Sequence, residues 1–264
     1  MALKRGKQTY LFQHPAAIRS FAAIGSKREG EGPLGEFFDT IDPDSTFGQK
    51  SWERAESRLH HDTVELAVKK AGLSYADLDC LLAGDLLNQC IGATFGVREL
   101  GIPYLGIYGA CSTFSEGLLL AAMALEGGCG ERAVVVTSSH FCTAERQFRF
   151  PLNYGGVRTP TAQWTATAAG AALVGFSGKP PFIRAATVGK IEDMGITDLN
   201  NMGAAMAGAA YDTLTRHMKH RGTHPQDYDV IITGDLGQVG SDLLYDLFQR
   251  DGVSLREHHK DCGL

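Results

Sequence analysis

The sequence predicts an α/β fold made of two related halves, each with a mainly parallel sheet. The first observation is an internal repeat, because residues 61–86 and 211–236 align at a constant offset of 150 without a gap. Nine of the 26 aligned positions are identical, whereas unrelated segments of average composition share roughly one or two. The second observation is that apolar strand candidates alternate with helical patterns, which is typical of parallel sheets covered by helices.

Each copy of the repeat carries the same local signals in the same order. A helical pattern ends at a glycine, Gly72 in one copy and Gly222 in the other, and a short acidic link leads to an apolar strand that ends in Gly-Asp-Leu. Strands are expected at residues 79–84, 103–108, 133–138, 168–174, 182–188 and 230–234. Helices are expected at residues 51–71, 88–100, 112–127, 203–221 and 241–250.

The two halves are expected to span residues 1–176 and 177–264. The segment "SGKPP" at the start of the second half favours a break there, because proline and glycine interrupt regular structure. In the first half the chain continues for 63 residues from Cys111 to Val174, but in the second half it stops two residues after the corresponding Cys262. This difference predicts an incomplete second half and a C-terminally truncated chain.

Composition excludes several classes of protein. The 264 residues carry a net charge of −5 without a basic block, which argues against a nucleic-acid-binding surface. No segment has the length and apolar character of a membrane span, and the N-terminus lacks the apolar stretch of a signal peptide. The six cysteines have no framework spacing, which favours reduced thiols on the cytoplasmic side of a membrane.

One of these cysteines, Cys111, falls where a strand is expected to turn into a helix, in "GACSTFSEGLLLAAMALEGG" at 109–128. The N-terminus of a helix lowers the pKa of a nearby thiol, and this placement is typical of a nucleophile. The alternative is a small buried residue that packs the turn. We interpret Cys111 as a residue of a binding pocket rather than as an attacking group.

A duplicated α/β chain with this cysteine turn resembles the thiolase superfamily, which includes thiolases and ketoacyl synthases. The Gly/Ala-rich strand "TATAAGAALVGF" at 165–176 is similar to the one that closes their first half. The chain resembles the stage V sporulation protein AD family of this superfamily more closely. The motifs that carry this resemblance are "EGPLGEFFD" (31–39), "AGDLLNQ" (83–89), "YGACST" (108–113), "TSSH" (137–140), "TAERQFRFP" (143–151), "GITD" (195–198) and "DCGL" (261–264).

The resemblance implies a role in a spore-forming bacterium. It implies a thiolase-like protein that binds dipicolinate (pyridine-2,6-dicarboxylate) and helps to move it into the forespore, and that acts again in germination. It implies calcium as a counter-ion of the ligand rather than as a cofactor. It further implies integral membrane proteins of the same sporulation operon as partners, a peripheral location on the forespore inner membrane, and a homodimer formed through the first half.

The sequence departs from the thiolase pattern in its second half. The superfamily has a catalytic histidine after the first strand of that half, but here "ITGDLGQVG" at 232–240 holds Asp235 and no histidine. A second superfamily catalytic position would follow Leu264. The preferred hypothesis is therefore binding without catalysis. The rival hypothesis is an acyl-transferring or condensing enzyme that uses Cys111 and an acyl-coenzyme A, and a third is an inert fragment.

Asp85 and Asp235 are the matching carboxylates of the two repeats. Each follows a strand end, which is where open α/β sheets bind ligands. The alternative for each is a side chain that caps the next helix, and we expect this role for at least one. Asn88, close to Asp85, is expected either in the same crevice or as a cap. Two carboxylates suit a dicarboxylate ligand only where cations or hydrogen-bond donors intervene.

The segment after the strand at 133–138 supplies the expected donors. Arg146 is expected to grip a ligand carboxylate through its planar guanidinium, and His140 to donate to the same group. Arg149 is expected on the opposite face, and the alternating Arg and Phe residues of 143–151 predict a strand-like segment at a dimer seam. The imidazoles at positions 217, 220 and 224 match a zinc pattern only weakly, and we expect a solvated helix face.

Overall fold

A computed structural model describes residues 2–148, 163–198 and 200–264. Contacts between residues divide the chain into two compact units. The described part of the first unit consists of residues 2, 12–148 and 165–184, and that of the second consists of residues 3–11, 163–164, 185–198 and 200–264. The expected boundary after Phe176 stays a prediction.

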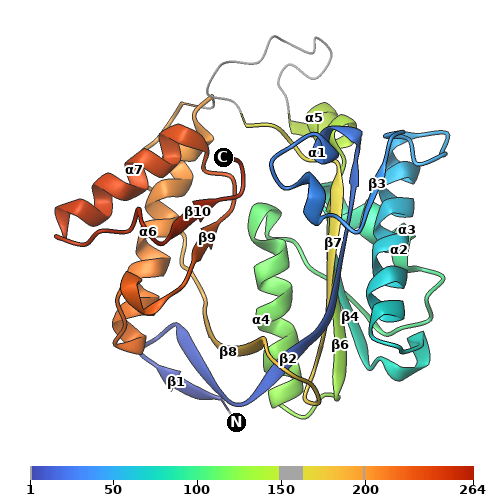
Figure 1. Ribbon diagram of the computed structural model, residues 1–264, viewed down its shortest axis with the longest axis horizontal. Coiled ribbons are helices and arrows are strands. Elements are labelled where there is room, and N and C mark those ends of the chain that lie inside the picture. The colour runs from blue at the N-terminus through green and yellow to red at the C-terminus, as the bar shows by residue number, and fades with distance from the viewer. Residues whose placement is uncertain (1, 149–162, 199) are drawn as a thin grey trace. The chain divides into compact units, whose positions relative to one another are not determined.

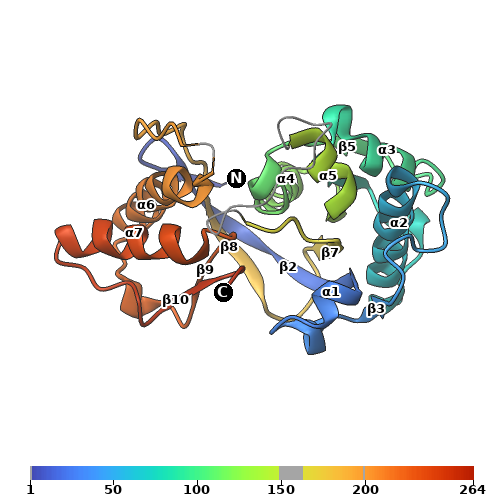
Figure 2. The ribbon, with the colours of Figure 1, turned by 90° about the horizontal axis from the view of Figure 1, so that it is seen from above.

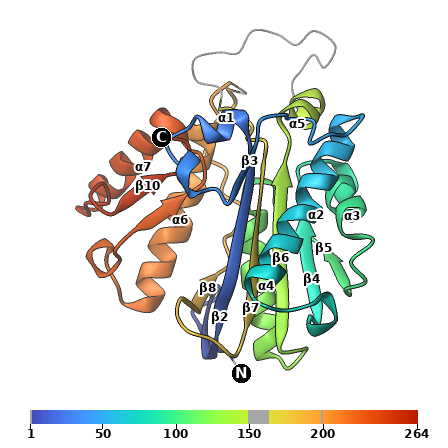
Figure 3. The same ribbon diagram turned by 45° about the vertical axis from the view of Figure 1, so that its right-hand side comes forward.

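The first unit contains a mixed sheet. Its strands lie in the order β2 (Thr9–Ser26), β7 (Ala168–Gly175), β6 (Arg132–Ser139), β4 (Cys80–Gly84) and β5 (Tyr104–Gly106) (Figure 3). β4 is parallel to β5 and β6, whereas β7 is antiparallel to both β6 and β2. The short β3 (Thr40–Asp42) also pairs with β2, and β1 (Leu3–Arg5) pairs with the first residues of β2, which like β1 belong to the second unit.

Helices cover both faces of this sheet (Figure 1). On one face, α2 (Trp52–Lys70) and α3 (Ile91–Val97) form one apolar core with alternate residues of β4, β6 and β7. On the other face, α4 (Thr113–Glu126) packs on the intervening residues of β4 and β6. The near-continuous apolar run of β6 follows from this arrangement, because a strand covered on both faces buries successive side chains.

The structure confirms the expected α/β class, but some elements differ from expectation. The 18-residue β2 was not predicted, because its sequence contains Pro15, which argues against a strand interior, and its register with β7 shifts between Ile18 and Ser20. The strand-like segment predicted at 143–151 is wrong, because α5 spans Phe141–Phe148. Its Thr143 and Ala144 are buried, so the inner face of the helix is formed by small residues. The alternation of Arg and Phe, on which the strand prediction rested, does not include them.

The second unit repeats part of the first. Its main elements are α6 (Met202–Arg221), β9 (Ile231–Thr233), α7 (Gly237–Arg250) and β10 (His259–Asp261), with the last residues of β8 (Phe182–Thr187). Figure 2 shows α6 and α7 packed side by side, and β9 is parallel to β10. The second unit also contains the 3₁₀ turn Pro225–Asp227, and the first unit contains the short helix α1 (Lys27–Gly30) and the 3₁₀ turns Gly35–Phe37, Tyr75–Asp77, Asn88–Cys90 and Ala110–Ser112.

Structure and sequence agree on the repeat. The turn that precedes β4 and the turn that precedes β9 are closed in the same way, with Asp77 accepting from the backbone N–H of Ser74 and Asp227 from that of His224, each at 2.8 Å. The identical aspartates of the two copies therefore have the same structural role. No described helix combines the length and the apolar character needed to cross a bilayer.

A tight approach at the end of β4 predicts a sharp difference between two glycine substitutions. In Gly84→Ala the new Cβ would lie 2.3 Å from the carbonyl oxygen of Ile107 and 2.6 Å from Cγ2 of Thr113, so we expect a loss of about 2–3 kcal/mol of stability. The control is Gly170→Ala in β7, where the new Cβ would have no atom within 4 Å apart from those of its chain neighbours. Thermal unfolding followed by circular dichroism measures both, and equal losses would contradict the packing described here.

Candidate functional site

Cys111 lies on a tight turn between β5 and α4, as expected. The turn is held by local hydrogen bonds, because Ser112 Oγ donates to the Gly109 carbonyl and Thr113 Oγ1 donates to the Ala110 carbonyl, both at 2.8 Å. The side chain of Cys111 is exposed, so the alternative of a small buried packing residue does not hold. α4 begins at Thr113 without a side-chain cap from Ser112, and its first N–H groups favour a negative ligand near the turn.

Strained backbone gathers at the ends of β4 and β5. Gln89 (φ 64°), Cys90 (φ 50°) and Ala110 (φ 48°) are three of the four described non-glycine residues with positive φ, and Phe47 is the fourth. A left-handed conformation at such residues costs of order 1–3 kcal/mol each and persists where the surroundings enforce it. The expected helix at 88–100 begins only at Ile91 for this reason. These strained residues mark this end of the sheet as a candidate site.

The carboxylate of Asp85, at the same end of the sheet, is hydrogen-bonded to backbone N–H groups. Only 2 % of its surface is exposed, and its Oδ1 accepts from Leu87 N at 2.7 Å while its Oδ2 accepts from Ala93 N at 2.5 Å. Burial raises the pKa of this carboxyl, and the backbone donors oppose that shift. The structure therefore gives Asp85 the capping role that we expected for one of the two aspartates.

His140 is buried, and both of its ring nitrogens have partners. Nε2 donates to the Ser45 carbonyl at 2.8 Å, and Nδ1 accepts from Cys142 N at 3.1 Å. The Trp52 ring packs against the imidazole with 5.2 Å between ring centroids. Burial lowers the pKa of His140, so the ring is neutral. For His140 to donate to a ligand, as the sequence suggests, it would have to release Ser45.

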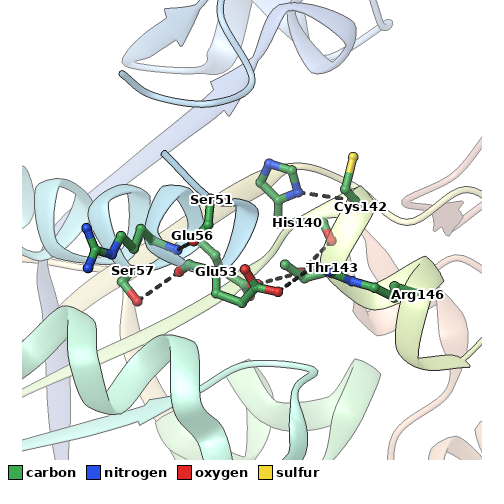
Figure 4. A network of polar contacts seen from close by, with 9 residues as sticks. Ser51, Glu53, Glu56, Ser57, His140, Cys142, Thr143 and Arg146 are labelled. Atoms are coloured by element: carbon green, nitrogen blue, oxygen red, sulfur yellow. Dashed lines mark hydrogen bonds and ion pairs between the residues drawn. The ribbon is translucent and has the colours of Figure 1, made fainter. Parts of the chain in front are cut away.

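The polar side chains of α5 are paired with neighbouring elements. Arg146 forms an ion pair with Glu53 of α2 (Figure 4). Gln147 Nε2 donates to Asn88 Oδ1 at 2.9 Å, and Asn88 N donates to Gln147 Oε1 at 3.3 Å. Asn88 thus connects the loop after β4 to α5. Arg149, expected on the opposite face of this segment, lies outside the described residues.

The structure brings most of the expected site residues to one end of the sheet. Asp85 and Asn88 follow β4, Cys111 follows β5, and His140 and Arg146 follow β6. Because these three strands are neighbours and parallel, their carboxyl ends meet at the same edge.

Asp235 belongs to the second unit, where it follows β9. Burial and the neighbouring Asp261 raise the pKa of its carboxyl. Asp85 and Asp235 therefore occupy matching positions of the repeat but have different neighbours.

A buried polar network beneath α5 was not predicted from the sequence. Glu56 and His60 are fully buried on α2. Thr143 Oγ1 donates to Glu56 Oε2 at 2.8 Å, and Ser138 Oγ donates to Glu56 Oε1 at 3.2 Å (Thr143 and Glu56 are visible in Figure 4). Ser138 Oγ also lies 3.0 Å from His60 Nδ1. The signal in the sequence is the spacing of four between Glu56 and His60 on the apolar face of a helix.

The network holds two groups with strongly shifted pKa values. Burial raises the pKa of Glu56 to about 7; the Thr143 hydrogen bond opposes this shift, and the negative charge of Asp85 adds to it. Burial lowers the pKa of His60 to about 3. At neutral pH, His60 is therefore uncharged and Glu56 is close to its titration midpoint.

The described residues offer little support for a resident metal. His61, Asp62 and Glu65 have ligand atoms within 4.8 Å of one another, but His61 Nδ1 pairs with the Gly96 carbonyl and Asp62 with Arg58. Such clusters are common without an ion.

The expected solvated histidine face of α6 is wrong for two of its residues. His217 Nδ1 bonds Thr187 Oγ1 and His220 Nδ1 bonds Thr9 Oγ1, each at 2.8 Å. Both imidazoles are half-buried, because Thr9 and Thr187 pack against this side of the helix.

Comparisons with known proteins agree with this fold. Residues 6–264 match the family model of stage V sporulation protein AD. The stage V sporulation protein AD of Bacillus subtilis is 46 % identical over 259 residues, which cover 98 % of this chain and 77 % of that protein.

Solved structures with a similar fold are enzymes of the thiolase type. The 3-oxoacyl-[acyl-carrier-protein] synthase III of Aquifex aeolicus has a TM-score of 0.60 and 14 % identity, over 93 % of this chain and 83 % of that one. Cerulenin-bound OleA of Xanthomonas campestris has a TM-score of 0.64 and 15 % identity, over 95 % of this chain and 82 % of that one. At these identities the similarity shows the fold alone, and it confirms the expected thiolase-like architecture.

The buried Glu56 predicts an unusual dependence of stability on pH. A carboxyl whose pKa is higher in the folded chain binds its proton more tightly there, so the stability that it contributes is lost as the pH rises from about 4.5 to about 7. Glu56→Gln keeps the neutral shape, and at pH 8 it should gain up to about 3 kcal/mol relative to its effect at pH 4. Urea unfolding at several pH values measures this gain.

Two comparisons make this measurement specific. Glu65→Gln removes an exposed carboxylate from the other end of the same helix and should leave the gain expected for Glu56→Gln unchanged. His60 acts in the opposite direction, because a depressed pKa gives stability that is lost as the pH falls from about 6.5 toward 3. Parallel pH profiles for the wild type and Glu56→Gln would refute a protonated Glu56.

Proposed function

Because the chain belongs to the stage V sporulation protein AD family, we propose that it serves spore formation as a ligand-binding protein on a thiolase-like scaffold. The proposed ligand is dipicolinate, taken up with calcium into the forespore and released in germination. The proposed partners are the integral membrane proteins of the same sporulation operon, with the protein peripheral on the forespore inner membrane. In the first unit the proposed contact residues are Cys111, Asn88, His140 and Arg146, and Asp85 holds the loop that carries Asn88.

The observation that carries binding without catalysis is the state of His140. Acyl transfer through a thiol needs a base for the thiol and donors for the developing oxyanion. Both nitrogens of His140 are occupied by backbone groups, and the carboxylate of Asp85 is held by backbone N–H groups. The segment 232–240 holds an aspartate where a thiolase has a histidine. The scaffold is therefore better suited to holding a ligand at Cys111 than to activating the thiol.

Two features favour an anionic ligand at this end of the sheet. The uncapped start of α4 presents backbone N–H groups beside Cys111, and such a helix terminus attracts negative charge. Arg146 lies on α5 at the same edge and already pairs with the carboxylate of Glu53. A ligand carboxylate would replace Glu53 on the guanidinium, whose planar donors fit a carboxylate.

The edge of the sheet favours a homodimer. β5 is the outer strand, and Leu105 on it is 56 % exposed. Tyr108 beyond β5, and Ile91 and Phe95 on neighbouring α3, are also exposed. An unpaired strand edge with apolar neighbours is a template for pairing with another chain. We therefore place the dimer contact of the proposed function at β5.

The grip on the ligand can be measured by calorimetric titration with dipicolinate. Arg146→Ala should weaken binding at least tenfold, which corresponds to roughly 1.4 kcal/mol, because a buried carboxylate would lose its donors. Glu53→Gln should strengthen binding, because the ligand no longer competes with a carboxylate. The matched control is Arg98→Ala, which removes an exposed arginine paired with Glu99 and should leave binding unchanged. Equal affinities for all three variants would place the ligand elsewhere.

The proposed absence of acyl-transfer chemistry has a separate test. After incubation with acetyl- or malonyl-coenzyme A, intact-mass spectrometry should detect no acyl adduct, because both nitrogens of His140 and both oxygens of Asp85 are already bound to backbone groups. A stoichiometric adduct that Cys111→Ser abolishes would establish the rival acyl-transferring enzyme. Binding of dipicolinate by Cys111→Ala, with a small loss due to shape, would be consistent with the proposed role of the thiol as a contact.

A further inference from the structure

Positive charge gathers at one end of the second unit, where the hairpin of β1 and the start of β2 (residues 3–11) meets the last turn of α6. Figure 1 shows the turn of this hairpin beside the C-terminal end of α6. Thr9 Oγ1 lies 2.8 Å from His220 Nδ1, and a Cβ at Gly6 would lie 2.2 Å from His220 Nε2. Gly6, which has a φ of 57°, therefore allows the turn to pack directly on the imidazole.

This contact brings together basic side chains from distant parts of the sequence. Three of them lie in the hairpin and two lie beside His220 at the end of α6, and we call this group the basic patch. It consists of Lys4, Arg5, Lys7, Lys219 and Arg221, all of which are exposed. None of the five forms an ion pair with another described residue.

The basic patch has little negative charge around it. No acidic residue occurs in residues 3–11. The first carboxylates after α6 are those of Asp227 and Asp229, and Asp227 already accepts from the backbone N–H of His224 at 2.8 Å. One turn earlier on α6, burial lowers the pKa of His217, and the positive charge of Arg221 lowers it further. Cations held together in this way attract an anionic partner.

Exposed apolar side chains border the basic patch. Leu3, next to Lys4 in β1, is 48 % exposed, and the Lys4 ammonium lies 6.0 Å from the centre of the Tyr10 ring. Val188 is 44 % exposed and lies beside the turn, because Val188 N donates to the Gln8 carbonyl and Gln8 Nε2 donates to the Val188 carbonyl, each at 2.9 Å. Basic residues beside exposed apolar and aromatic groups are typical of surfaces that bind at the interface of a bilayer.

We propose that the basic patch is a docking surface for an anionic lipid membrane. Its cations contact the headgroup phosphates, while Leu3 and Val188 enter the boundary between headgroups and acyl chains. A nucleic acid carries phosphates too, but it would leave these apolar side chains without a partner. The proposal rests on the peripheral location proposed above, and it adds the surface and the lipid charge by which the chain reaches the membrane.

Co-sedimentation of the full chain with lipid vesicles, in the absence of dipicolinate, tests this surface. We expect binding to vesicles of equal parts of phosphatidylcholine and phosphatidylglycerol, and none to phosphatidylcholine alone. Raising the ionic strength from about 0.1 M to about 1 M should release the chain, because the Debye length falls from about 10 Å to about 3 Å.

Charge reversal on each element makes the test specific. Lys4→Glu combined with Lys7→Glu should weaken binding to the anionic vesicles at least tenfold, and Lys219→Glu on α6 should weaken it at least threefold. The matched control combines Lys50→Glu with Lys260→Glu, which makes the same change in net charge at two exposed lysines of other elements. This control should bind like the wild type.

Several outcomes would overturn the assignment. One is no binding to the anionic vesicles, and another is binding that the Lys4 and Lys7 changes leave intact. Equal weakening by the control pair would show that net charge alone matters. A DNA duplex that binds the wild type as tightly as the vesicles do, and that the same double variant no longer binds, would reassign the patch to nucleic acid.

The same variants keep this proposal separate from the proposed ligand. The substituted side chains are exposed, so the fold should stay intact, and the circular dichroism spectrum of each variant checks this. In calorimetric titration, the double variant at Lys4 and Lys7 should bind dipicolinate like the wild type. Loss of dipicolinate binding together with vesicle binding would show that the two changes damage the chain as a whole and would contradict a separate membrane surface.

Discussion

The two hydrogen bonds accepted by the Asp85 carboxylate hold together the end of the sheet where the site lies. They tie the turn after β4 to the first turn of α3, and the left-handed Gln89 and Cys90 lie between these anchors. The second residue of α3 is Gly92, at which a Cβ would lie 3.2 Å from Asp85 Oδ2 and 3.3 Å from the carboxyl carbon of Glu56. One turn later, a Cβ at Gly96 would lie 2.8 Å from the Ser57 carbonyl oxygen, so the close approach of α2 and α3 here needs residues without a side chain.

That approach places two buried carboxyl groups on either side of Gly92, and two negative charges at this separation would repel each other. Asp85 has backbone N–H donors, whereas the donors to Glu56 in the part of the chain that the structure describes are the hydroxyls of Ser138 and Thr143. The proton therefore resides preferentially on Glu56. A neutral Glu56 also suits the neutral His60 beyond Ser138, because no charge is then left uncompensated in this part of the core. Thr143 joins α5 to this arrangement through its hydrogen bond to Glu56.

The sequence predicted the elements whose signals are local. The repeat and the strands β4, β6 and β7 follow from apolar patterns, and the cysteine turn follows from its glycine and the long apolar helix after it. The partners of the site residues could not be predicted in this way, because His140 bonds a carbonyl 95 positions away and Glu56 bonds hydroxyls more than 80 positions away. Such contacts depend on how helices pack on the sheet. A polar residue on an apolar helix face indicates only that a partner must exist.

The two copies of the repeat also differ mainly in contacts between elements that are distant in the sequence. Positions that close the local turn are identical in both, since Asp77 and Asp227 bond their own backbone whatever lies around them. Positions that face a covering element have diverged, and Ala67 of the first copy corresponds to His217 of the second. Ala67 is sealed beneath strands, where an imidazole would find neither space nor partner. His217 borders a hollow and bonds Thr187, which in turn bonds Thr9, so the second copy has replaced an apolar contact with a chain of hydroxyl and imidazole groups. The two copies thus share the hydrogen bonds that each forms within its own turn, and they differ in the contacts that each forms with other elements.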